Sequence, residues 1–167
     1  MSRNHERAWR LLAERVRLAA PARCALYAIL AALTASGLWW VAAHFGQGSV
    51  GGDSDELHRL AQEALALKVH GASAFATLLA IGAMGARHVP RGWALGRNRV
   101  SGSMVVAGFV LLIATGYALY YLVGETTHMP VSLLHWIAGF VLVPLLIGHV
   151  IVGRRSRRAN ERRSAGG

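Results

Sequence analysis

Long apolar runs separated by short charged blocks dominate this chain. Four of the runs reach the length of ~20 residues that an α-helix needs to cross the hydrocarbon core of a bilayer. They cover residues 24–45, 64–88, 102–123 and 131–152. Inside a bilayer the backbone polar groups of a span must bond within their own segment, so these runs predict helices. The two-residue alternation of an outer-membrane barrel is absent. We therefore expect an all-α integral membrane protein, a four-helix bundle.

Composition supports this class and excludes others. The 167 residues are 54% hydrophobic and 16% charged, whereas soluble domains are nearer ~25% charged. The high apolar content excludes disorder, and a single cysteine, Cys24, excludes a disulfide scaffold. The net charge of +10 stands in short blocks between spans rather than on a polar face. It therefore indicates contact with membrane lipid and no nucleic acid.

The distribution of basic residues predicts the orientation. All but two of the 18 Lys and Arg residues lie before the first run, between the second and third runs, or after the fourth. The exceptions are Arg59 and Lys68. Because cytoplasmic loops carry the excess of Lys and Arg, both termini are expected in the cytoplasm. Residues 1–23 form a basic amphipathic segment, either a helix on the inner membrane surface or a solvated arm. Residues 154–167 form a basic tail.

Histidines are the candidate chemical groups. Four of the eight lie in the second and fourth spans in a regular pattern, and ionisable groups inside a membrane usually have a function. His70 and His88 are 18 residues apart and His135 and His149 are 14 apart, so each pair shares a helix face. The two spans run in the same direction. We therefore expect His70 and His135 near the outer side, and His88 and His149 near the inner side.

Facing imidazoles on parallel helices suit the two axial positions of a haem iron. The pattern predicts two b haems, one held by His70 and His135 and the other by His88 and His149. Both iron coordination spheres would be filled, so the sites would transfer electrons and carry no catalytic residue of their own. The rise between the pair is ~27 Å in the second span and ~21 Å in the fourth, a difference that helix tilt could absorb. His44 is a possible substitute for His70.

Glycines and arginines near these histidines have simpler interpretations. Gly102, Gly108 and Gly116 in the third span favour helix packing. Arg87 and Arg91 follow the positive-inside rule, and could also contact haem propionates on the inner side.

Two other functions remain open. One is a metal-ion transporter or sensor that uses an outer cluster of His44, His58, His70, His128 and His135. The other is an assembly subunit without a cofactor, in which the imidazoles are hydrogen-bonded within the bundle. No covalent haem motif, nucleotide-binding loop or nucleophile elbow is present.

The sequence resembles the bacterial di-haem membrane cytochromes b, in particular the four-helix subunits of hydrogenases and formate dehydrogenases. The matching stretches are LLHWIAGFVLVPLLIGHV, with His135 and His149, and KVHGASAFATLLAIGAMGARHV, with His70 and His88. The likeness covers about residues 24–152. It implies an electron-transfer subunit of an oxidoreductase complex in the bacterial cytoplasmic (inner) membrane, rather than a complete enzyme.

The resemblance also implies partners. Electrons would pass between a periplasmic redox protein or dehydrogenase subunit and the quinone pool, with a quinone site near the inner haem and Arg87 or Arg91 as polar contacts. An outer alternative uses Tyr120, Tyr121, Glu125 and His128. In the family the inner haem takes a ligand from the cytoplasmic start of the first helix, where this chain has Arg23 and Cys24. The likeness therefore implies a variant in which His88 supplies that ligand.

Overall fold

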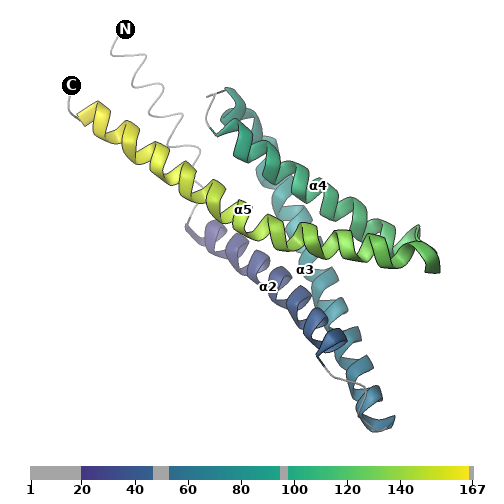
Figure 1. The fold of residues 1–167 in the computed structure, drawn as a ribbon. Helices are drawn as coiled ribbons and strands as arrows, with labels where there is room; N and C mark the ends of the chain where they lie inside the picture. The colour runs from purple at the N-terminus through teal and green to yellow at the C-terminus, as the bar shows by residue number, and fades with distance from the viewer. Residues whose placement is uncertain (1–19, 47–52, 95–97, 166–167) are drawn as a thin grey trace. The chain divides into compact units, whose positions relative to one another are not determined.

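The computed structural model describes residues 20–46, 53–94 and 98–165, and within these ranges the chain is helical without a strand (Figure 1). The helices are α2 (Ala20–Phe45), α3 (Asp53–Ala94), α4 (Arg99–Tyr121) and α5 (Glu125–Ala165). The predicted all-α class is confirmed. The predicted amphipathic segment 1–23 lies mostly outside the described residues, which begin at Ala20.

All four helices contain a stretch long and apolar enough to cross a membrane, as predicted. The candidate spans are Pro21–Phe45, Ser54–Ala86, Arg99–Tyr121 and Glu125–Ser156. Only 6% to 11% of the most apolar window of each is buried inside the protein. The described core is correspondingly small, and its buried hydrophobic residues are Ala43, Ala66, Val105 and Leu142. In water so large an apolar surface would be costly, so lipid is its natural environment.

Two helices continue well beyond the apolar runs. The α3 helix begins at Asp53, about three turns before the predicted span, and continues to Ala94. The α5 helix runs from Glu125 to Ala165 and so includes most of the predicted basic tail. Pro90 and Pro144 lie inside these helices. A change from apolar to charged residues marks the membrane boundary, but nothing in the backbone requires the helix to end there.

The chain divides into two compact units, residues 1–88 and 89–167, which we describe one at a time. The first contains α2 and most of α3, and the second contains α4 and α5. Each unit is a pair of antiparallel helices joined by a short connection. The packing of all four helices into a bundle stays a prediction.

Three contacts define the register of α4 against α5. Ser101 contacts His149, Gly108 faces Leu142, and Thr115 contacts His135. Each step of seven residues forward along α4 is matched by seven residues backward along α5, which is about two helical turns. Gly108 permits the closest approach, because a Cβ atom there would lie 2.8 Å from Cδ1 of Leu142. His135 and His149 of α5 therefore face α4 along one seam.

The α2 and α3 helices pair in the same way. Ser36 contacts His70 near the middle of the hairpin, and His44 contacts Glu63 nearer its connecting loop. Ala66, which is completely buried, lies between His70 and Glu63 along α3. The register places it opposite Trp40. This hairpin therefore also directs a histidine of its second helix against its first helix.

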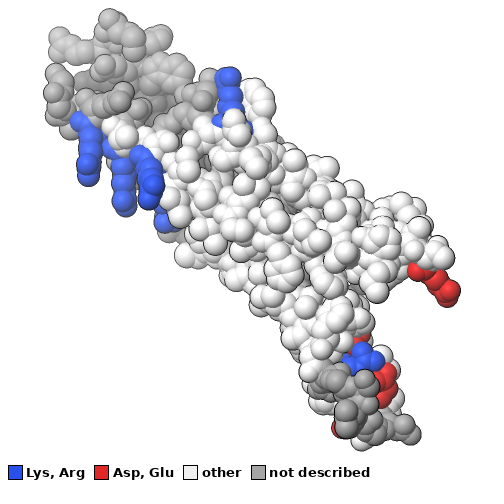
Figure 2. Space-filling model, viewed as in Figure 1, with Lys and Arg blue, Asp and Glu red and all other residues white. Residues whose placement is uncertain are grey.

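The C-terminal end of α5 is strongly basic. Exposed arginines follow the apolar span, and Figure 2 shows them as a group beyond the uncharged surface of the helix. They are Arg154, Arg155, Arg158 and Arg162. The start of α5 carries Glu125 in its first turn. This contrast is the charge pattern on which the orientation prediction rests.

Candidate functional site

The imidazole of His135 is held by a hydroxyl from the neighbouring helix. Its Nδ1 atom lies 2.8 Å from Oγ1 of Thr115. The Thr115 hydroxyl also lies 2.8 Å from the carbonyl oxygen of Leu111 and has only one proton to donate. If that proton pointed at His135, the hydroxyl oxygen of Thr115 and the carbonyl oxygen of Leu111 would face each other without a proton between them. Thr115 therefore donates to Leu111 and accepts from Nδ1–H, which leaves the lone pair of the neutral ring on Nε2.

His149 repeats this arrangement at the other end of the seam between α4 and α5, about four helical turns from His135. Its Nδ1 atom lies 3.0 Å from Oγ of Ser101, and that hydroxyl is 3.3 Å from the carbonyl oxygen of Asn98. The same assignment follows: Ser101 donates to the backbone and accepts from the imidazole. Asn98 adopts a left-handed conformation with φ 52° immediately before α4. The turn into α4 thus places both the carbonyl and the hydroxyl that position His149.

His70 forms the third such contact, in the first unit. Its Nδ1 atom lies 3.2 Å from Oγ of Ser36 and 3.1 Å from the carbonyl oxygen of Leu33. A carbonyl can only accept, so Nδ1 of His70 carries the proton. The Ser36 hydroxyl in turn donates to Leu33 over 3.0 Å. His70 therefore also has the lone pair on Nε2.

A glycine follows the hydroxyl residue at each contact. A Cβ atom on these glycines would lie 3.2 Å (Gly37), 3.6 Å (Gly102) and 3.4 Å (Gly116) from Cε1 of the imidazole. The absent side chain lets the Nδ1–Cε1 edge of each ring lie close to the neighbouring helix. We call the three pairs Ser36–Gly37, Ser101–Gly102 and Thr115–Gly116 the hydroxyl–glycine pairs.

Sequence reasoning missed these pairs. It assigned Gly102 and Gly116 to helix packing, whereas both lie against an imidazole; Gly108 does pack against Leu142. A signal was available, since a hydroxyl residue followed by glycine occurs at 101 and again at 115, the 14-residue spacing of His135 and His149. Two antiparallel helices with equal spacings can bring both pairs into register.

The fourth predicted ligand behaves differently. His88 is exposed and forms no such contact with any described residue. The side chains of Arg87 and Arg91 lie outside the described part of the structure. The pairing of His70 with His135, and of His88 with His149, joins residues of different units and stays a prediction.

His44, the predicted substitute for His70, has other partners. It stacks on Trp40 with ring centroids 4.7 Å apart, and its Nδ1 atom lies 3.4 Å from Oε2 of Glu63. Arg59 pairs with Glu63 and also with Glu56, over 2.7 Å in the latter case. His44 therefore belongs to a half-exposed charged cluster near the connecting loop of the hairpin. Of these two histidines, His70 is the one that a hydroxyl–glycine pair holds.

The indole nitrogen of Trp40 is a buried hydrogen-bond donor. Among the described residues, its Nε1 atom is buried without a hydrogen-bond partner. A buried N–H left unpaired costs about 1–3 kcal/mol. Trp40 follows Ser36 by about one turn, so their Cα atoms lie ~6 Å apart along α2.

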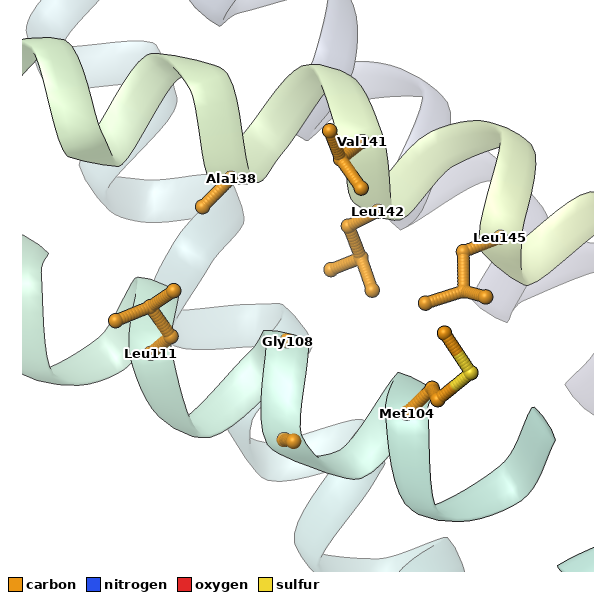
Figure 3. Close-up of a pocket in the computed structure, with 8 residues that line it drawn as sticks. Met104, Gly108, Leu111, Ala138, Val141, Leu142 and Leu145 are labelled. Atoms are coloured by element: carbon orange, nitrogen blue, oxygen red, sulfur yellow. The ribbon is translucent and has the colours of Figure 1, made fainter. Parts of the chain in front are cut away.

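An apolar groove of about 300 Å³ lies between α4 and α5. It is centred on Gly108 and Leu142, between the levels of the two imidazole contacts, and Figure 3 shows aliphatic side chains around it. Its lining residues are Met104, Ala107, Gly108, Leu111, Ala138, Val141, Leu142 and Leu145. It offers no polar group to a ligand, so it separates the levels of His135 and His149 by hydrocarbon.

A conventional metal site is not found in the described part of the chain. No three His, Cys, Asp or Glu side chains there converge closely enough to hold an ion. The predicted outer cluster of five histidines is thus not assembled within either unit. Comparison of the chain with protein-family models, with curated proteins and with solved structures found no match.

Proposed function

We propose that this protein is a membrane electron-transfer cytochrome b that binds two b haems through paired imidazoles. One observation carries the proposal. His70, His135 and His149 lie in membrane-spanning helices, and each directs Nδ1–H to a hydroxyl on the neighbouring helix. This second hydrogen bond is characteristic of metal-binding histidines, because it fixes the tautomer that keeps the lone pair on Nε2.

The donor set fits haem better than a bare ion. A zinc site needs about four ligands, and the described residues do not bring three together. A haem iron needs only two, because the porphyrin supplies the rest. The apolar residues around the imidazoles would suit a planar apolar macrocycle. The buried N–H of Trp40 would give a propionate carboxylate a donor near His70.

The pairing of ligands rests on the sequence spacing. His70 and His135 would hold the outer haem, and His88 and His149 the inner one, with both chain termini in the cytoplasm. Because His88 lacks the hydroxyl contact, its role is the weakest of the four assignments. Arg87 and Arg91 lie on the side of the inner haem, as contacts for propionates or for a quinone.

The chain's residues orient and insulate the cofactor, and the haem supplies one-electron chemistry. With both axial positions filled by imidazole, a substrate has no open position, which suits a subunit of a larger complex. The proposed flow is between a periplasmic redox protein or dehydrogenase subunit and the quinone pool, across the bacterial inner membrane. The apolar groove between the levels of His135 and His149 would exclude water from the path.

A visible spectrum of the full chain purified from membranes tests the proposal. We expect reducible b-type bands and about two haems per chain, because four imidazoles are assigned to two irons. Colourless protein carrying zinc or copper would contradict it in favour of ion transport. Colourless protein free of metal would contradict it in favour of an assembly subunit.

A further inference from the structure

The acceptors at the three imidazoles are not equivalent. Nδ1 of His135 lies 2.8 Å from a threonine hydroxyl, and Nδ1 of His149 lies 3.0 Å from a serine hydroxyl. Nδ1 of His70 lies near both a hydroxyl and a backbone carbonyl, at 3.2 and 3.1 Å. Each hydroxyl itself donates to a backbone carbonyl three or four residues earlier in the chain, which leaves it no proton to offer the ring.

We propose that Ser36, Ser101 and Thr115 are positioning residues that hold the imidazoles in the Nδ1–H tautomer and set how strongly Nε2 donates electrons to iron. This inference rests on the proposed cytochrome function. It goes beyond that function because it assigns to three of the four proposed ligands, His70, His135 and His149, a residue that regulates the reduction potential of the haem.

The sign of the effect follows from the hydrogen bond. An acceptor at Nδ1–H increases the basicity of Nε2 and so strengthens its bond to iron. Stronger donation stabilises the more positive ferric state over the ferrous state, which lowers the potential. Removal of a hydroxyl should therefore raise the potential of the haem it serves.

Thr115→Val is the sharpest variant, because valine keeps the shape of threonine and removes only the hydroxyl, which accepts from His135 and donates to the carbonyl of Leu111. We expect the reduction equilibrium of one haem to shift by about five- to tenfold toward the ferrous form, a tenfold change being about 59 mV for one electron. The other haem should be unchanged. A redox titration followed by optical and electron paramagnetic resonance spectra of the full chain measures both.

Two variants control for structural effects. Thr115→Ser keeps a hydroxyl at the same position and should restore the wild-type potential. Thr34→Val removes an exposed hydroxyl that bonds to the carbonyl of Leu30 on its own helix, at 2.9 Å, and should shift the potential of neither haem.

Ser101→Ala, acting through His149, should raise the potential of the haem that Thr115→Val leaves unchanged.

The possible results either support or overturn the positioning role of the hydroxyls. The inference is supported by the expected shift, or by loss of one haem in Thr115→Val but not in Thr115→Ser or Thr34→Val. An unchanged or lowered potential with both haems present overturns it, as does an equal shift in Thr34→Val. If the wild-type chain purifies without haem, the proposed function fails. Nitrogen-15 spectra of the same protein then test the positioning role alone, since it requires Nδ1–H at His135 in the wild type and a mixture of tautomers in Thr115→Val.

Discussion

His135→Ala is expected to reduce the haem content of the purified protein from two per chain to about one. In the proposed site His135 would supply one of the two protein bonds to the iron, and alanine has no nitrogen to replace the imidazole. The haem held by His88 and His149 should stay six-coordinate and reducible. Haem assay and reduced-minus-oxidised spectra of protein purified from membranes measure the loss.

The companion variants make this result specific. His149→Ala should remove the other haem and spare the first. His58→Ala is a matched control, because His58 is exposed near the N-terminal end of α3 and bonds to Gln62 over 2.9 Å. It should retain both haems. Full haem content in both His135→Ala and His149→Ala would refute the ligand assignment, and loss of both haems in each would refute the independent pairing.

Gly37→Val is expected to abolish haem binding at His70, although it replaces none of the proposed ligand residues. A Cβ atom at this position already lies 3.2 Å from Cε1 of His70, and valine adds two further carbons. The ring cannot retreat without breaking its bonds to Ser36 and Leu33. We expect loss of one haem and a decrease of about 1–3 kcal/mol in the free energy of unfolding, typical of overpacking. Haem content and unfolding in detergent mixtures measure the two effects.

Gly82→Val separates this local clash from the general effect of a β-branched residue in a spanning helix. Gly82 lies in α3, and a Cβ atom there would meet nothing within 4 Å among the described residues. This variant should keep both haems. If Gly37→Val does so as well, the glycine does not fit the imidazole against α2 and the account of the hydroxyl–glycine pairs fails.

The helices could be predicted from sequence because their cause is local. Runs of about 20 apolar residues have one stable backbone form in a bilayer, and the helices α2, α3, α4 and α5 each contain one. The ends of the helices were harder to predict. Residues 53–63 and 153–165 are polar, so hydropathy assigned them to a loop and a tail, yet they continue α3 and α5. In these segments helix propensity and ion pairs, such as that of Arg59 with Glu63, stabilise the helix. An average of hydropathy over a window of residues does not detect either of them.

The histidines within the spans could be singled out as candidate site residues, because ionisable residues are rare there, and their role as haem ligands stays a prediction. Their hydrogen-bond partners could not, since Ser36, Ser101 and Thr115 lie 34, 48 and 20 residues away in sequence. Finding them requires the register between two helices, which is set by contacts such as Gly108 with Leu142. The distinction between His70 and His44 likewise depends on which side of the α2–α3 seam each ring occupies.

Electron paramagnetic resonance of the oxidised full chain tests the central claim most directly. Two ferric irons, each bound by two imidazoles, should give low-spin signals with an intensity of about two irons per chain and no high-spin signal. A dominant high-spin ferric signal would show that an axial position is open. The absence of any haem signal would show that the imidazoles of His70, His135 and His149 serve another purpose.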